Sequence, residues 1–133
     1  MAEISDPGVS ELLSKPNHAV LSTLNSDGSI HSAVIWLNTE ADKLALNTAR
    51  GRAWPTNLER DPNATLLLLN EDNPYEYVEI RGTAELTDEG ADEHIDTLAQ
   101  KYINQDKYPW RSPEEQRVKV LLTPKRVRHA KAG

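Results

Sequence analysis

Six short segments rich in β-branched, aliphatic and aromatic residues are the feature that most constrains how this chain folds. Each is bounded by residues that favour turns, and the Asn-Ser-Asp-Gly sequence at 25–28 is a strong hairpin signal between the first two. The segments cover residues 18–24, 29–37, 43–47, 64–70, 75–86 and 117–130. We therefore predict that strands, and not helices, build the body of the molecule.

Helical patterns occur only between or before these strands. Residues 5–14 and 52–60 each predict a short helix, and a longer one is expected to begin after Thr87 or Asp88. Six strands with two or three inserted helices predict a mainly β fold, a six-stranded antiparallel barrel. Apolar residues alternate onto both faces of segment 29–37, as expected of a strand inside a barrel or at a subunit contact.

Length and composition place the chain among single-domain proteins. Its 133 residues, of which 38 % are hydrophobic, are enough for one core, so we expect a single domain over 1–133. No apolar run approaches the roughly 20 residues of a membrane span, and the N-terminal residues lack the pattern of a secretory signal. A cytoplasmic protein without membrane contact is the expectation.

Missing residue types exclude several chemistries. The chain has no cysteine, which rules out disulfides, a thiolate nucleophile and cysteine-bound metal clusters. Its four histidines, at 18, 31, 94 and 129, include no pair at metal-ligand spacing, so we predict no metal site.

The net charge of −6 is unevenly distributed. Residues 71–96 contain ten acidic side chains against Arg81 alone, which predicts a solvated face on which His94 is exposed. Residues 117–131 contain six basic side chains and no acid, a pattern typical of an edge strand guarded by Lys and Arg. The overall acidity argues against nucleic-acid binding, although a local basic cluster could hold a small polyanion.

The stretch from Thr48 to Arg52 is the most informative for chemistry. A predicted strand ends at Thr48, Arg50-Gly51-Arg52 follows, and a predicted helix begins directly afterwards. Free backbone N–H groups at a helix start, two guanidinium groups and a glycine that admits close approach together make a seat for phosphate. The alternative is a strand-to-helix turn whose arginines are only solvated, and spacing alone leaves both interpretations open.

At this point the sequence resembles a family. The stretches S-D-G-S-I-H-S-A-V-I-W, L-N-T-A-R-G-R, N-L-E-R-D-P and Y-V-E-I-R-G-T-A-E, in this order, are similar to those of the flavin/deazaflavin oxidoreductases. These form part of the pyridoxamine 5′-phosphate oxidase-like, FMN-binding split-barrel superfamily, and the likeness is greatest to its coenzyme F-420-dependent branch. It covers residues 10–127, nearly the whole chain.

The resemblance implies a homodimer of split barrels with a flavin-type cofactor in each of two grooves between the subunits. Positions implied to line the ring on the second strand include Ser32, Ala33, Val34 and Trp36. Positions implied to hold the phosphate are Thr48, Arg50, Gly51 and Arg52. Asn57, on the family's helix, is expected to be structural.

Trp54 departs from the family pattern, because many F-420-binding members have a lysine there. Either the phosphate relies on the arginines and backbone amides, with Trp54 packing against the cofactor, or Trp54 is a core or interface residue. His31 is a candidate proton donor beside the ring, with a purely structural histidine as the alternative. Aromatic residues at 102, 108 and 110 either reach the partner's groove or cover a barrel mouth.

The implied function is an oxidoreductase that transfers a hydride between reduced coenzyme F-420 and a small conjugated organic acceptor. The cofactor would perform the chemistry, which agrees with the absence of a recognisable nucleophile or acid–base pair, and no catalytic residue is assigned. Two alternatives remain: an FMN-dependent enzyme like pyridoxamine-phosphate oxidase, or a non-catalytic carrier of a flavin or deazaflavin.

Overall fold

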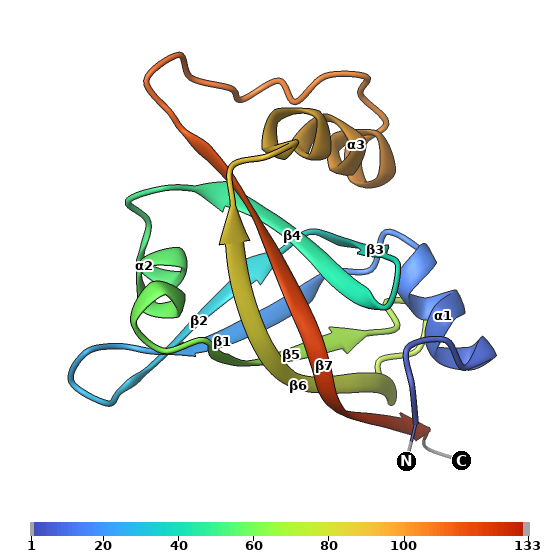
Figure 1. Ribbon diagram of the computed structural model, residues 1–133. Coiled ribbons are helices and arrows are strands. Elements are labelled where there is room, and N and C mark those ends of the chain that lie inside the picture. The colour runs from blue at the N-terminus through green and yellow to red at the C-terminus, as the bar shows by residue number, and fades with distance from the viewer. Residues whose placement is uncertain (1, 132–133) are drawn as a thin grey trace.

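The computed structural model describes residues 2–131 and consists of seven strands and three helices (Figure 1). The strands are β1 (Ala19–Leu24), β2 (Ile30–Ile35), β3 (Leu37–Glu40), β4 (Lys43–Ala49), β5 (Asn63–Leu69), β6 (Glu76–Thr87) and β7 (Arg117–Lys131). The helices are α1 (Pro7–Ser14), α2 (Ala53–Arg60) and α3 (Ala91–Ile103). The predicted mainly β split-barrel fold is confirmed, with α1 before the first strand and α2 and α3 inserted between strands.

All seven strands form one antiparallel sheet in the order β2-β1-β5-β6-β7-β4-β3. β2 and β3 are consecutive in the chain but lie at opposite edges of this sheet, and Trp36 is the single residue between them. The sheet therefore curls until its two edges meet at Trp36 (Figure 1). We call this meeting point the seam.

The seventh strand arises because the predicted strand 29–37 is divided at Trp36. Residues before Trp36 pair with β1, as Ile30 does with Leu24. Leu37, which follows Trp36, pairs instead with Leu46 of β4. The apolar run 29–37 thus supplies β2 and the first residue of β3, while the rest of β3, residues 38–40, is polar. Alternation of residue types along the chain could not reveal this second edge strand.

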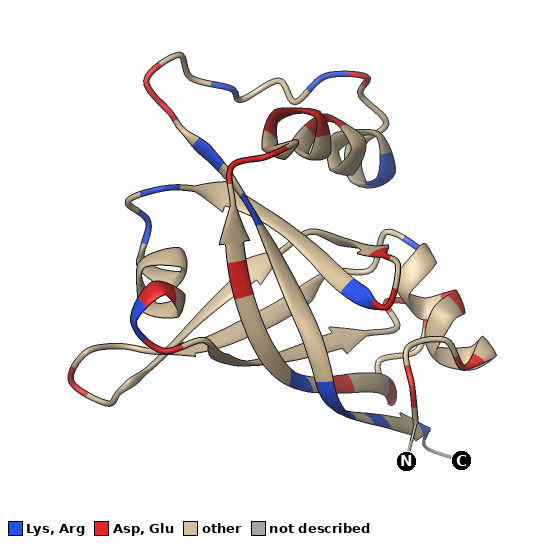
Figure 2. Ribbon diagram, viewed as in Figure 1, with Lys and Arg blue, Asp and Glu red and all other residues tan. Residues whose placement is uncertain are grey.

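β7 pairs with β6 over most of its length, but with β4 only over residues 117–122. The predicted edge strand is therefore wrong for 117–122, whereas beyond Leu122 the described residues offer the second side of β7 only an isolated bridge from Ala2 to Val127. The basic residues of β7 beyond Pro124, namely Lys125, Arg126, Arg128 and Lys131, gather at the lower end of the strand in Figure 2. The same strand begins with Arg117, whose side chain is only 3 % exposed.

Gly82 permits a bulge in the long strand β6. The register between β6 and β7 shifts between Arg81 and Gly82, and a Cβ at position 82 would collide with the carbonyl oxygen of Thr123. Only glycine allows β7 to approach β6 so closely at this bulge.

The core fills the inside of the curled sheet with aliphatic side chains. Leu21, Leu66, Ile80 and Leu122, from four different strands, are at most 1 % exposed. α1 contributes Val9, Leu12 and Leu13 to the same cluster, and α2 adds Trp54 and Leu58. Because these helices pack on the barrel, the start of α2 is fixed relative to the strands that surround the seam.

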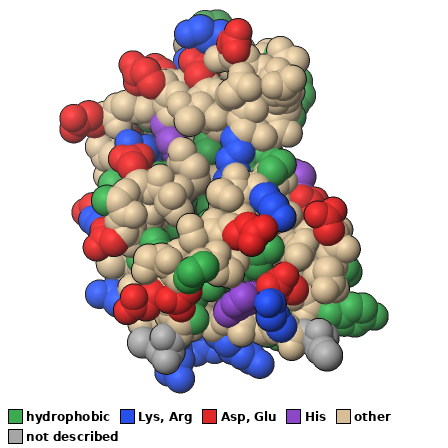
Figure 3. Space-filling model, turned by 90° about the vertical axis from the view of Figure 1, so that its right-hand side faces the viewer, with side chains coloured by type: hydrophobic (Ala, Val, Ile, Leu, Met, Phe, Trp, Pro, Cys, Tyr) green, Lys and Arg blue, Asp and Glu red, His purple; other side chains and the backbone are tan. Residues whose placement is uncertain are grey.

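Acidic and basic side chains are interspersed over the face shown in Figure 3, with a group of Lys and Arg at its lower edge. Within residues 2–131, none of the three helices is long and apolar enough to cross a membrane. The same residues contain no group of three His, Asp or Glu side chains arranged to hold a metal ion.

Candidate cofactor site at the barrel seam

A pocket of about 170 Å³ opens beside Trp36, where β2, β4, the start of α2 and the loop after α3 come together. We call it the seam pocket. Its polar lining consists of Asn47, Thr48, Arg52 and Arg117, and its aromatic lining of Trp36, Trp54, Tyr108 and Trp110. Val34, Ile35 and Ile95 complete it.

The turn that carries Arg52 into this pocket is built by Gly51. Gly51 has a φ of 94°, a conformation that residues with a Cβ rarely adopt. Arg52 then acts as the N-cap residue of α2, and its carbonyl oxygen accepts a hydrogen bond from the Thr56 hydroxyl at 2.8 Å. The first amides of α2, which have no acceptor within the helix, therefore lie beside Arg52 and add a positive dipole end.

Arg50 and Arg52 point to different partners. The Arg50 guanidinium binds two carboxylates, Glu59 at 2.7 Å and Asp88 at 3.0 Å. It does not line the seam pocket, so within the described residues the two arginines do not converge on one point. Arg52, which is half-exposed, is the arginine of the pair that faces the pocket.

Thr48 lines the same pocket and carries an unsatisfied hydroxyl. The residue is 1 % exposed, and its Oγ1 has no hydrogen-bond partner in the part of the chain that the structure describes. A buried hydroxyl without a partner costs free energy, so most such groups bond to protein, water or ligand. A phosphate or another acceptor in the seam pocket would satisfy it.

A buried hydrogen-bond network lies behind the pocket. Arg117 Nε donates to Asn47 Oδ1 at 2.9 Å, and Asn47 Nδ2 in turn bonds His94 Nδ1 at 3.1 Å. His94 Nε2 completes the chain by donating to Asn38 Oδ1 at 2.8 Å, which assigns the proton of the neutral ring to Nε2. The network holds Arg117 in one orientation at the pocket wall.

His94 is 6 % exposed, so its predicted exposure is wrong. Burial, together with the nearby charges of Lys119 and Arg117, lowers the pKa of His94 from 6.5 to about 4, against an opposing effect of Glu40. The imidazole is therefore neutral at pH 7 and can accept the hydrogen bond from Asn47.

The aromatic wall is continuous. Trp36 stacks on Tyr102 with ring centroids 5.3 Å apart and planes 4° from parallel. Tyr108 and Trp110 lie at 6.2 and 6.4 Å from Trp36, and the Arg117 guanidinium sits 5.1 Å from the Tyr108 ring. The loop after α3 thus packs against the seam of its own chain, and its reach toward a partner's groove stays a prediction.

Lys101 and Tyr102 join the end of α3 to the seam. Lys101 Nζ donates to the carbonyl oxygens of Leu13 and Leu37, at 2.6 and 2.7 Å. Tyr102 donates its hydroxyl proton to the carbonyl of Asn17 at 2.7 Å. Burial lowers the pKa of Lys101 to about 8 and raises the pKa of Tyr102 to about 12.

The structure brings together Val34, Trp36, Thr48, Arg52 and Trp54 of the residues singled out in the sequence. Ser32 lies on the exposed face of β2 with its hydroxyl 3.3 Å from that of Ser22, and Ala33 packs toward the core. Neither lines the seam pocket, nor do Arg50 and Gly51, among the described residues. Their roles toward a cofactor stay predictions.

Two further sequence expectations concern His31 and Asn57. Asn57 is buried and donates to Thr23 Oγ1 and Asn25 Oδ1, at 3.1 and 2.9 Å, so it anchors the β1–β2 hairpin as a structural residue. His31 does not line the seam pocket, and its Nδ1 is buried without a partner in residues 2–131.

Sequence reasoning missed Arg117, Asn47 and the loop residue Glu115. Their common property is burial against one another: Glu115 Oε1 accepts from Arg117 at 2.7 Å, and Glu115 Oε2 accepts from Arg52 at 3.3 Å. In the sequence Arg117 is one of six basic residues at 117–131. Only its position at the start of β7, next to a predicted loop, distinguishes it from the other five.

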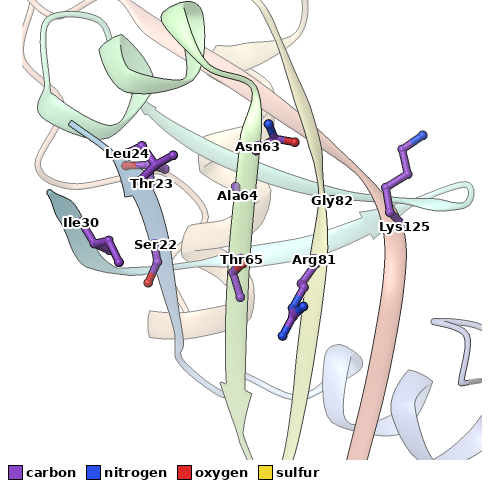
Figure 4. A pocket seen from close by; sticks show the side chains of 10 residues that line it. All are labelled: Ser22, Thr23, Leu24, Ile30, Asn63, Ala64, Thr65, Arg81, Gly82 and Lys125. Carbon is purple, nitrogen blue, oxygen red and sulfur yellow. The ribbon is translucent and has the colours of Figure 1, made fainter. Parts of the chain in front are cut away.

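A second hollow, of about 380 Å³, lies on the outer side of β1, β5 and β6 (Figure 4). It includes Arg81 and Lys125, but the two side chains point in opposite directions in Figure 4. Thr48 and His31, the described residues with unsatisfied buried polar atoms, do not line it. The seam pocket is therefore the stronger candidate.

The fold and the seam pocket define a split β-barrel protein with a cationic and aromatic pocket where the barrel closes. Residues 5–131 match the family model described as pyridoxamine 5′-phosphate oxidase, and the chain belongs to this family. No curated protein sequence matches the chain.

Several solved structures share the fold. An F420 reductase superposes with a TM-score of 0.80 at 23 % identity, covering 92 % of this chain and 98 % of the other. The conserved hypothetical protein Rv2991 from Mycobacterium tuberculosis gives 0.76 at 22 % identity, with coverages of 96 % and 84 %. A putative pyridoxamine 5′-phosphate oxidase from Listeria innocua gives 0.73 at 20 % identity, with coverages of 94 % and 97 %.

Proposed function

We propose that this protein is an oxidoreductase that binds a flavin-type cofactor in the seam pocket and transfers a hydride between reduced coenzyme F-420 and a small conjugated organic acceptor. The observation that carries the proposal is the buried, unsatisfied Thr48 hydroxyl, which shares the pocket with Arg52 and the aromatic wall. Membership in the family of pyridoxamine 5′-phosphate oxidase, and a neighbour named F420 reductase, support it.

The residues present fit such a cofactor. Thr48, Arg52 and the amides at the start of α2 offer donors to a phosphate, and Arg117 adds a guanidinium held in a fixed orientation. Trp36 and Trp54 offer flat apolar surfaces to a ring or to the cofactor's tail. When bound, the cofactor supplies the hydride chemistry, while these residues bind it, orient it and keep water away from it.

The proposed site needs a second copy of the chain. At about 170 Å³ the pocket is smaller than the roughly 300–1,000 Å³ that encloses a drug-sized ligand, so one chain holds only part of a flavin. Val34 lines the pocket and is also 67 % exposed, on the edge strand β2. We propose a homodimer whose contact begins at this strand and completes each site.

The exposed face of the sheet supports this contact. Strand register places Val20 beside Val34 and Leu67, and Leu24 beside Ile30. We call the group formed by Val20, Leu24, Ile30, Val34, Leu67 and Leu69 the outer apolar patch. Ile30 is 69 % exposed, and an unpaired edge with such a patch favours association with another protein surface.

FMN is the second candidate cofactor, and Trp54 is the observation that favours it. Trp54 is 6 % exposed and supplies no charge at a position where many F-420-binding members of the family have a lysine. The shorter anionic tail of FMN requires fewer basic residues. A carrier that binds either cofactor without catalysis would use the same pocket.

The deciding experiment titrates purified protein with F-420 and with FMN while tryptophan fluorescence is recorded, since all three tryptophans of the chain line the pocket. We expect quenching by F-420, followed by oxidation of the reduced form when a conjugated acceptor is added. Quenching by FMN alone would identify the second candidate. Absence of quenching by both would refute the assignment of the seam pocket to a flavin-type cofactor.

A further inference from the structure

Glu115 already binds the two arginines that face the seam pocket. Its Oε1 lies 2.7 Å from Arg117 NH1, and its Oε2 lies 3.3 Å from Arg52 NH2. The Glu115 side chain is 14 % exposed, so this carboxylate is poorly screened by water. One internal anion therefore shares the positive charge that a ligand phosphate would use.

The backbone holds this carboxylate in place. The Glu115 amide donates to Ser112 O at 3.1 Å, and the next residue, Gln116, accepts a hydrogen bond from the Arg50 amide at 2.9 Å. Glu115 thus sits on a segment tied to the turn that carries Arg52. It contacts the arginines from outside the seam pocket and leaves the pocket side to a ligand.

The two arginines differ in how much they depend on Glu115. Arg117 is 3 % exposed, and a buried guanidinium without a counter-ion is costly, so Glu115 neutralises it. Arg52 is 54 % exposed and reaches Glu115 only at 3.3 Å, so it can exchange this carboxylate for a phosphate. Competition between the two anions is centred on Arg52.

We propose that Glu115 is a specificity-determining residue, a built-in competitor that weakens binding of phosphate-bearing ligands at Arg52 and leaves uncharged ring systems unaffected. This inference rests on the proposed function of the seam pocket. According to this inference Glu115 opposes the binding of a phosphate-bearing ligand, whereas a residue that merely held Arg52 and Arg117 in place would promote it. Replacing Glu115 should therefore raise the affinity for such a ligand in the first case and lower it in the second.

The test compares FMN with riboflavin, which has the same ring and no phosphate. At low salt, Glu115→Gln should bind FMN about fivefold more tightly than wild type, and riboflavin within about twofold of wild type. The FMN gain should shrink at high salt and vanish when Arg52→Ala is added. Isothermal titration calorimetry measures all of these affinities without requiring turnover.

Glu114→Gln is the matched control, because Glu114 is an exposed neighbour with the same charge. It should bind FMN like wild type. Glu115→Asp provides a second, milder variant, because the shorter side chain cannot reach both arginines equally. Its affinity for FMN should rise about twofold. Unchanged or weaker FMN binding in both Glu115 variants, or an equal gain for riboflavin, would overturn the inference.

The outcome is separable from that of the proposed function. If wild type binds neither flavin nor F-420, the cofactor assignment fails, and inorganic pyrophosphate then serves as the probe for Arg52. Tighter pyrophosphate binding by Glu115→Gln than by Glu114→Gln would still support competition, and equal or undetectable binding would exclude it.

Discussion

Thr48 keeps a buried hydroxyl at the end of β4 although no described residue satisfies it. Thr48→Val preserves the shape of the side chain and removes the unsatisfied group. The free energy of unfolding should therefore stay equal or rise by up to about 1 kcal/mol, as urea denaturation would measure. Affinity for FMN or F-420 should fall at least about tenfold, because a hydrogen bond to a charged phosphate is lost.

A stability loss with unchanged affinity would contradict this account of Thr48. Thr56→Val is a suitable control, because Thr56 is exposed and does not line the seam pocket. Its hydroxyl donates to the Arg52 carbonyl oxygen. Its variant should change cofactor affinity little.

His94 makes the fold sensitive to acid. Its folded pKa of about 4 lies below the ordinary 6.5, so between these values the unfolded chain binds the proton more readily. Stability is unaffected above pH 6.5 and falls as the pH drops from 6.5 toward 4, by about 2 kcal/mol at pH 4.5.

Urea denaturation at pH 7 and pH 4.5 measures this loss. His94→Gln should lose about 2 kcal/mol less than wild type over that interval. His18→Gln, which changes a half-exposed histidine, should keep the wild-type acid sensitivity. An identical acid response of wild type and His94→Gln would show that another group dominates.

At the residue scale the sequence predicted which types gather at the site but not their partners. Val34, Trp36, Thr48, Arg52 and Trp54 were identified and do share the seam pocket. Arg50 and Arg52 are equivalent in the sequence, and Glu59 of α2 together with Asp88, which follows the far end of β6, draws Arg50 away. Such pairings depend on contacts between distant segments and leave no local signal.

Among the elements, β6 is the one whose geometry depends most on a single residue. Gly82→Ala would place a Cβ against the Thr123 carbonyl, in the backbone of the adjacent strand, where neither side can give way. We expect a loss of more than about 2 kcal/mol in the free energy of unfolding, measured by urea denaturation. A Cβ at position 28 would meet open space, but the residue has a positive φ. Gly28→Ala should therefore lower the free energy of unfolding by less, about 1 kcal/mol. Equal small losses at both positions would contradict the close approach at the bulge.

Local sequence patterns predicted well where strands and helices lie along the chain. They did not predict which strands are neighbours in the sheet. The hairpin at 25–28 and the helix before Asp61-Pro62 formed where turn signals and Pro residues required. The division of 29–37 at Trp36 and the interior position of residues 117–122 of β7 arise from closure of the whole barrel, to which no short segment contributes a recognisable signal.

For the molecule as a whole, the outer apolar patch predicts self-association. Ile30→Asp places a charge on an exposed residue of the patch and should shift the sedimentation coefficient at micromolar concentration from dimer toward monomer. Thr97→Asp adds the same charge on an exposed position of α3 and should leave the dimer intact. A wild-type protein that sediments as a monomer would refute the dimer.

The central claim is that the seam pocket holds the phosphate of a flavin-type cofactor through Arg52. Calorimetric titration of FMN into wild type, Arg52→Ala and Arg50→Ala at low salt tests it most directly, with riboflavin as the phosphate-free comparison. We predict that Arg52→Ala weakens FMN binding about ten- to a hundredfold while Arg50→Ala and riboflavin affinity change little. FMN binding that survives Arg52→Ala, or that is lost equally in Arg50→Ala, would contradict the account.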